Sequence, residues 1–256
     1  MIVKEKLWSE PEQEYKNLFI YLPDDYNTST DRYPVMYYFD GHNLFDNEDA
    51  TYGKSWGLKE FMAGWEKEMM IVGVECSHKG DHRLSEYCPY PCQAFGSDIK
   101  GDGKATMEWM TKVLKPYIDN KYRTYSFREA TGIAGSSMGG LMACYAVAAY
   151  NDVYSKAACL SSSTGIVMDE MVRLITEGPV DPDTRVWLSW GEFEGGQCTG
   201  DPEEDSWGAV INHRTADLFK AHGAVTRVYF QRGGHHCEAD WEKQNEMYMN
   251  FLWLNR

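Results

Sequence analysis

Basic residues are scarce in this chain, and long apolar runs are missing. Its 256 residues include 25 Lys and Arg against 39 Asp and Glu, which gives a formal net charge of −14 at pH 7. Because such a charge repels phosphate backbones and anionic lipid, we expect no nucleic-acid partner. No stretch approaches the roughly 20 apolar residues that a membrane-spanning helix needs, so we also expect no membrane partner.

The features of exported proteins are equally sparse. Residues 1–6 lack the apolar core of a signal peptide. The cysteines number seven, an odd count scattered along the chain, which argues against a disulfide framework. Cys144 and Cys159 lie in apolar runs, as reduced core residues do. We therefore expect a cytoplasmic protein, and the sequence leaves its oligomeric state open, a homo-oligomer included.

What the sequence does contain is an alternation of strand-like and helix-like segments, without a repeat or a linker. The apolar runs at 34–39 and 69–74 are typical of strands covered on both faces. Residues 104–120 and 238–254 favour helices. Repeated βα units predict an α/β fold with a mostly parallel sheet and helices on both faces. We expect a single domain over residues 1–256.

The most informative motif is a G-x-S-x-G at residues 135–139, with Ser137 at its centre. It follows a run of small apolar residues and precedes a good buried helix at 141–149. That context is typical of a nucleophile elbow, in which a strand turns sharply into a helix and exposes the serine. A second copy at 53–57, centred on Ser55, follows a polar segment that cannot be a buried strand. We therefore predict Ser137 as the nucleophile.

A serine hydroxyl needs a base, usually a histidine held by a carboxylate. In the α/β-hydrolase order the acid and then the histidine follow the serine, each after a strand. The strand expected at 225–230 is followed by His235 and His236, and either could be the base. The strand expected at 185–190 is followed by Glu192 and Glu194, and spacing does not choose between them.

The oxyanion of an acyl-transfer intermediate needs two backbone N–H donors. One is expected from Met138, directly after the nucleophile. The other is expected from the loop after an earlier strand, where Gly41 lets the chain turn and His42 follows it. We therefore predict an oxyanion hole formed by the N–H groups of Met138 and His42.

With these residues in place, the chain resembles the putative esterase family of the α/β-hydrolase superfamily, which has esterase D-like, feruloyl esterase-like and siderophore esterase-like members. The resemblance rests on residues 33–45, on an R-x-x-E-Y-x-P segment at 83–89, and on residues 114–124 and 134–141. It also rests on an H-x-E-x-x-W end that falls on His236, Glu238 and Trp241.

This resemblance implies His236 as the base and Glu194 as the acid. The short segment after Ser161 indicates a small lid or none. The family often has Gln where His42 stands, a difference that leaves the triad untouched.

We expect a serine esterase without a cofactor or a resident metal, acting on a small-molecule ester through an acyl-enzyme. A small or aromatic acyl group is expected, such as a carbohydrate-linked feruloyl or acetyl ester, in a pocket formed by Tyr87, Trp56 and Trp241. An acyltransferase with the same triad is the alternative enzyme. Outside enzyme chemistry, the sequence also allows a non-catalytic binding module or a structural zinc site, the latter suggested by His78-x3-His82 and Cys88-x3-Cys92.

Overall fold

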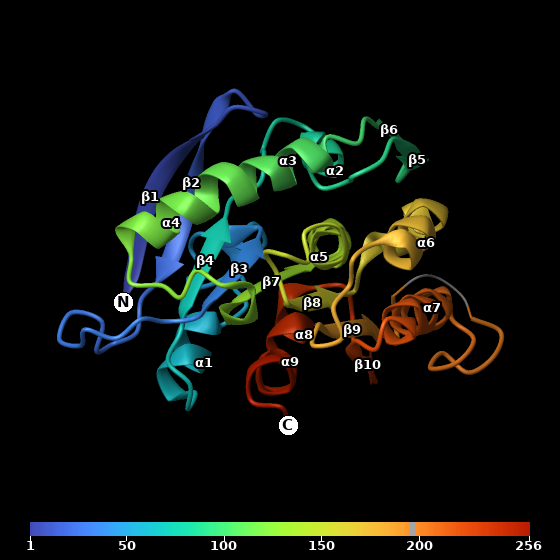
Figure 1. Ribbon diagram of the computed structural model, residues 1–256. Coiled ribbons are helices and arrows are strands. Elements are labelled where there is room, and N and C mark those ends of the chain that lie inside the picture. The colour runs from blue at the N-terminus through green and yellow to red at the C-terminus, as the bar shows by residue number, and fades with distance from the viewer. Residues whose placement is uncertain (195–197) are drawn as a thin grey trace.

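The computed structural model describes residues 1–194 and 198–256. Within these residues the main sheet has eight strands in the order β1-β2-β4-β3-β7-β8-β9-β10 (Figure 1). The strands are β1 (Ile2–Ser9), β2 (Glu14–Tyr21), β3 (Val35–Phe39), β4 (Met70–Val74), β7 (Thr131–Ser136), β8 (Lys156–Leu160), β9 (Arg185–Gly191) and β10 (Val225–Gln231).

The pairing of these strands is mostly parallel. β1 and β2 are antiparallel to each other, and β2 is antiparallel to β4, whereas every pair from β4 across to β10 is parallel. All residues of β3, β4 and β7 are buried, as their apolar or small side chains require in a sheet covered on both faces. The expected α/β fold class is confirmed.

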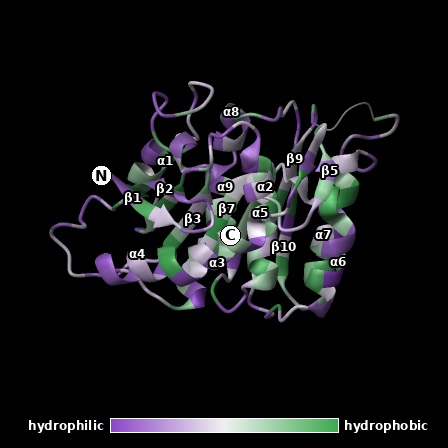
Figure 2. Ribbon diagram, turned by 90° about the horizontal axis from the view of Figure 1, so that it is seen from above, coloured by the Kyte–Doolittle hydropathy of each residue, from purple (hydrophilic) through white to green (hydrophobic). Residues whose placement is uncertain are grey.

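Helices cover both faces of the sheet (Figure 1). One face carries a mostly buried apolar cluster beneath α3 (Gly103–Trp109), the π-helical turn η2 (Met110–Leu114), α4 (Lys115–Lys121), α5 (Met138–Ala149), α6 (Met168–Glu177) and α7 (Trp207–Ala221). The other face packs a second cluster beneath α1 (Leu58–Gly64) and α9 (Asn245–Trp253). Figure 2 shows hydrophobic residues gathered in the sheet and these helices, with hydrophilic residues in the connecting loops.

The remaining elements are short and lie in the connections. They are η1 (Gly41–Asn43), α2 (His82–Glu86), η3 (Arg128–Ala130), η4 (Ser163–Val167), α8 (Glu238–Glu242) and the hairpin of β5 (Cys92–Ala94) with β6 (Ser97–Ile99). η1 follows β3, α5 follows β7, and α8 follows β10. Because the carboxyl ends of parallel strands share one edge of a sheet, these elements bring polar side chains to that edge.

Two sequence expectations need correction. The helix expected at 238–254 is two helices, because the chain leaves α8 after Glu242 and enters α9 at Asn245. The helix expected at 104–120 is continuous but widens to π-helical hydrogen bonding over Met110–Leu114. β1 and the β5–β6 hairpin were not expected from the sequence.

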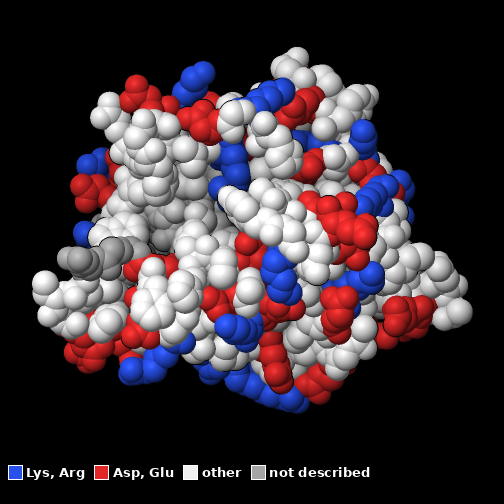
Figure 3. All heavy atoms as spheres, turned by 180° about the vertical axis from the view of Figure 1, so that it is seen from behind, with Lys and Arg blue, Asp and Glu red and all other residues white. Residues whose placement is uncertain are grey.

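Among the described residues no helix is both long and apolar enough to cross a membrane. On the face drawn in Figure 3, basic side chains are interspersed with clusters of acidic ones. The net negative charge is therefore not a single uniform patch on that face.

Candidate active site

Ser137 lies at the junction of β7 and α5, where the chain turns with φ 58° and ψ −120°. This backbone conformation is uncommon for a residue with a side chain. The flanking glycines make the turn possible, because a Cβ at Gly135 would lie 2.5 Å from the carbonyl carbon of Gly139. The strand, the glycine-flanked serine and the helix are thus arranged as in a nucleophile elbow.

Ser55, at the centre of the second motif copy, lies in different surroundings. Its side chain is buried in a loop before α1, and its hydroxyl donates a hydrogen bond to the carbonyl of Phe45 (3.3 Å). No strand of the described sheet leads into it. In the fold, as in the sequence, a buried strand precedes the motif copy of Ser137 and not the copy of Ser55.

His236 follows β10 and Glu194 follows β9, and the two side chains face each other. Nδ1 of His236 lies 3.3 Å from Oε2 of Glu194. The other carboxylate oxygen, Oε1, accepts a hydrogen bond from the Ser161 hydroxyl (2.7 Å). The Ser161 hydroxyl in turn accepts one from the indole N–H of Trp241 (2.8 Å). The carboxylate is therefore held from one side while it faces the imidazole with the other.

The two neighbouring candidates, His235 and Glu192, are engaged elsewhere. His235 faces Asp240, with 3.4 Å between Nδ1 and Oδ2. Glu192 accepts a hydrogen bond from the backbone N–H of Gly233 (2.7 Å), which joins the loops after β9 and β10. The geometry thus brings together His236 and Glu194.

Ser137 and His236 line one cavity of about 500 Å³ at the carboxyl edge of the sheet. The His236 side chain is 46% exposed, so its ring meets solvent on one side. Within the described residues no hydrogen bond joins the Ser137 hydroxyl to His236. Such a bond is commonly long before substrate binds.

The loop after β3 forms another wall of this cavity. Asp40 has a φ of 56°, and Gly41 packs so tightly on β4 that a Cβ there would lie 2.3 Å from the carbonyl carbon of Gly73. This contact fixes the path of η1 and with it the backbone of His42. Opposite η1, Met138 begins α5, where the first N–H groups of a helix have no partner within the helix. Both N–H groups predicted for the oxyanion hole thus come from elements beside the cavity.

Arg83 holds the loop after β3 through a two-pronged ion pair with Asp40. Nε of Arg83 donates to Oδ1 (2.7 Å) and Nη2 donates to Oδ2 (2.6 Å). Burial alone would raise the pKa of Asp40, but the Arg83 guanidinium outweighs it and lowers that pKa. The backbone N–H of Asp40 also donates to the Tyr87 hydroxyl (3.2 Å). The sequence indicates this R-x-x-E-Y segment only by resemblance and does not reveal these contacts.

Glu86, the acidic residue of the same segment, holds the chain after β4. Its carboxylate accepts a hydrogen bond from the N–H of Ser77 (2.6 Å) and lies 2.9 Å from Nζ of Lys16. Burial raises the pKa of Glu86 to about 7, against the lowering effect of Lys16. The segment thus fixes two of the loops that line the cavity.

The three predicted pocket aromatics lie at different depths. Trp241 lines the cavity. Trp56 is 2% exposed and packs behind it, with 5.6 Å between the two ring centroids. Tyr87 is 1% exposed and packs edge-on against Phe39 (4.9 Å). Trp56 and Tyr87 therefore stand behind the cavity wall.

The histidines and cysteines considered for a structural zinc do not gather in one place. His82 pairs with Glu12 (2.7 Å), whereas Cys88 lies near Cys92, with 3.9 Å between the two sulfur atoms. His78 instead lies beside His42, with 5.0 Å between the ring centroids. Burial lowers the pKa of His42, and this effect outweighs the raising effect of the nearby Asp40 charge.

A mostly parallel sheet with helices on both faces and a nucleophile elbow at its carboxyl edge defines an α/β-hydrolase. A family model described as "Putative esterase" matches residues 9–248, and the chain belongs to that family. It is therefore a carboxylic ester hydrolase.

The chain is also similar to individual proteins. The chain is 26% identical over 191 residues to "Uncharacterized protein YbbA" of Bacillus subtilis, covering 73% of this chain and 72% of YbbA. It is 32% identical over 149 residues to "Esterase Rv1288" of Mycobacterium tuberculosis, covering 57% of this chain but only 28% of that longer protein. The crystal structure of an IroE-like serine hydrolase from Shewanella oneidensis shares the fold, with a TM-score of 0.76 at 18% identity, covering 98% of this chain and 81% of that one.

Proposed function

We propose that the protein hydrolyses carboxylic esters through an acyl-enzyme on Ser137. His236 removes the proton from the Ser137 hydroxyl, which attacks the ester carbonyl, and Glu194 orients His236. The N–H groups of Met138 and His42 bind the oxyanion. His236 then protonates the leaving alcohol, and water releases the acid. The observation that carries this proposal is one cavity lined by Ser137 and by His236, whose Nδ1 faces Glu194.

Hydrolysis is favoured over acyl transfer by the exposure of the base. Deacylation requires a nucleophile that approaches the acyl carbonyl beside His236. Because 46% of the His236 side chain is exposed, bulk water reaches that position. An acyltransferase has to exclude this water in favour of another alcohol. The exposure of His236 therefore supports water as the acceptor.

The substrate we propose is an ester of a small or aromatic acid, such as a feruloyl or acetyl ester of a carbohydrate. A cavity of about 500 Å³ has room for such an acyl group. Trp241 and Tyr52 offer aromatic surface on its wall, and Tyr52 is 80% exposed. The net charge of −14 disfavours polyanionic esters.

We further propose that residues 1–256 form one esterase domain in the cytoplasm. Strands from both ends of the chain, β1 and β10, belong to the same sheet, which supports a single domain. The seven cysteines, all of which the structure describes, are free thiols, as is usual in a reducing compartment.

Labelling with a fluorophosphonate probe tests the triad. The probe reacts with an activated serine, so we expect the native chain and Ser55→Ala to label and Ser137→Ala to remain unlabelled. Ser55→Ala is the matched control, because it changes the same residue type in the second motif copy. A native chain that is folded but unlabelled would overturn the proposal, as would labelling that survives in Ser137→Ala.

A further inference from the structure

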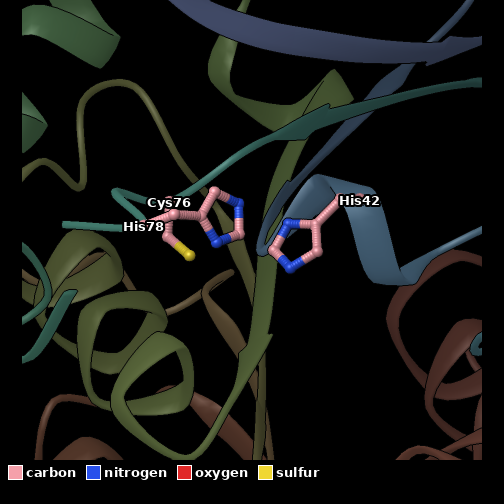
Figure 4. Close-up of side chains that lie close together, drawn as sticks. All are labelled: His42, Cys76 and His78. Atoms are coloured by element: carbon pink, nitrogen blue, oxygen red, sulfur yellow. The ribbon is translucent and has the colours of Figure 1, made fainter. Parts of the chain in front are cut away.

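Three side chains that can bind a metal meet on the cavity wall: His42 from η1, and Cys76 and His78 from the segment after β4. One potential ligand atom from each lies within 4.8 Å of the other two. Figure 4 shows the ring of His42 facing the side chains of His78 and Cys76. All three residues line the same cavity as Ser137. None of them is needed as a base, acid or nucleophile in the reaction proposed above.

One nitrogen of the His42 imidazole has no hydrogen-bond partner among the described residues. Its Nε2 lies 2.9 Å from the Thr51 hydroxyl, which occupies that nitrogen. Its Nδ1 is buried and has no hydrogen-bond partner among the described residues. The residue is only 5% exposed, so water does not readily satisfy this atom. A buried polar atom without a partner is costly, and a metal ion would relieve that cost.

The imidazole of His78 is held in a complementary way. Its Nε2 lies 3.0 Å from Oε1 of Glu75. An ionised carboxylate only accepts hydrogen bonds, so Nε2 donates, and in the neutral tautomer that does so Nδ1 has the lone pair. A metal-binding histidine typically has its second nitrogen on a carboxylate or another oxygen in this manner. His42 and His78 both meet that condition.

Two imidazole nitrogens and a thiolate are ligands for Zn²⁺ and poor ligands for Mg²⁺ or Ca²⁺. Three protein ligands leave the fourth position of a tetrahedral ion open. Because all three residues line the cavity, that position would be open to it. In a tetrahedral zinc site, neighbouring ligand atoms are about 3.3–3.8 Å apart, given the usual bond lengths. The present separations of up to 4.8 Å therefore have to shrink by about 1 Å when an ion binds.

We propose that His42, Cys76 and His78 form a Zn²⁺ site and that zinc binding inhibits the esterase. Because Gly41 fixes η1 against β4, the side chains of Cys76 and His78 move toward the ring of His42. The thiol of Cys76 releases its proton to solvent in the cavity as the Zn–S bond forms. The bound ion then takes up space in the cavity that Ser137 also lines and hinders the approach of the ester. The inhibitory part rests on the proposed function, whereas the zinc site does not.

Zinc binding is tested first, by calorimetric titration of Zn²⁺ into chelator-treated protein. We expect one ion per native chain. Cys76→Ser, His78→Ala and His42→Gln should each weaken binding at least tenfold, and His42→Gln keeps the backbone N–H. The matched controls are His82→Ala and Cys92→Ser, which remove the same residue types outside the cluster and should bind zinc like the native chain. Absence of zinc binding, or equal binding in the cluster variants and the native chain, would overturn the site.

Inhibition is then tested as the ratio of fluorophosphonate labelling rates with and without zinc in each variant. We expect zinc to slow labelling at least tenfold in the native chain, His82→Ala and Cys92→Ser, and to leave the rate unchanged in His78→Ala. An equal effect of zinc in His78→Ala, or no effect in the native chain, would overturn inhibition through this site. If native Ser137 never labels while zinc still binds, the proposed function fails and the zinc site stands.

Discussion

The indole of Trp241 donates a hydrogen bond to the hydroxyl of Ser161 at 2.8 Å. The Ser161 hydroxyl in turn donates a hydrogen bond to Oε1 of Glu194 (2.7 Å), so both residues restrain the Glu194 carboxylate. Glu194 uses its other oxygen to face His236. In the proposed triad the acid is thus oriented by two residues that touch neither the nucleophile nor the base through a hydrogen bond.

Ser161→Ala should lower kcat about tenfold with little change in KM. A hydrogen bond to an ionised carboxylate contributes about 1.5–3 kcal/mol, and its loss lets Glu194 rotate away from His236. Steady-state hydrolysis of p-nitrophenyl acetate measures both constants. Ser97→Ala is the control, since the Ser97 hydroxyl donates to an exposed carboxylate elsewhere, and it should match the native chain. An unchanged kcat in Ser161→Ala would show that Glu194 needs no such support.

Arg83→Met should destabilise the fold by about 3–5 kcal/mol. It leaves the Asp40 carboxylate buried without its partner, and breaking a buried ion pair from one side has that cost. Urea unfolding at pH 7 gives the free energy. Arg232→Met removes a pair whose arginine side chain is 75% exposed, so it should change stability by less than about 0.5 kcal/mol. Equal effects of the two substitutions would contradict the importance of burial.

Ser137→Gly should be about 1 kcal/mol more stable than Ser137→Ala. The φ of 58° strains any residue with a Cβ, and glycine removes that strain. Ser136 supplies the comparison, because it lies within β7, where Gly should be less stable than Ala. Thermal and urea unfolding of the four variants would show this reversal. The same preference for Ala at both positions would mean that the elbow stores no strain.

Lys156→Met should stabilise the protein at pH 7 by about 1–2 kcal/mol and lose that advantage in alkali. Burial lowers the pKa of Lys156 to about 8 from an ordinary 10.5. Between these values the unfolded chain binds more protons than the folded one, so native stability rises with pH. The gap between variant and native chain should therefore close from pH 8 to pH 10.5 in urea unfolding. Lys220→Met, at an exposed position, should show no such trend, and a constant gap for Lys156→Met would refute the assignment.

The sequence predicted the parallel strands β3 and β4, because their apolar runs are typical of strands buried on both faces. β1 was not predicted, because it is an edge strand whose side chains alternate between half-buried and exposed. Its charged residues Lys4, Glu5 and Lys6 break up the apolar pattern by which a buried strand is predicted. The break after Glu242 was also not evident, since no glycine or proline marks it.

For the proposed site, local patterns predicted Ser137 as the nucleophile and left two candidates each for the base and the acid. Contacts between distant segments could not be read in this way. Arg83 meets Asp40 across 43 positions, and Ser161 meets Glu194 across 33. The cluster of His42 with Cys76 and His78 was hidden for the same reason. Residue spacing suggested His82, four positions along the chain, as a zinc-binding partner of His78. The pairing of β3 with β4 instead brings the loop of His42 beside the segment of Cys76 and His78.

The strand order divides the enzyme at the border between β7 and β8. The residues before 150 build the part with Ser137, the proposed nucleophile, and the loop of His42, and the segments after β9 and β10 contain Glu194 and His236. The half with the proposed acid and base is thus contiguous in the sequence. Recombination between relatives at residues 150–155 would exchange that half as a unit. Only one strand pair of the sheet, β7 with β8, would then combine strands from different relatives. In such a family, new pairings of the Ser137 elbow with the Glu194–His236 pair can arise by a single crossover.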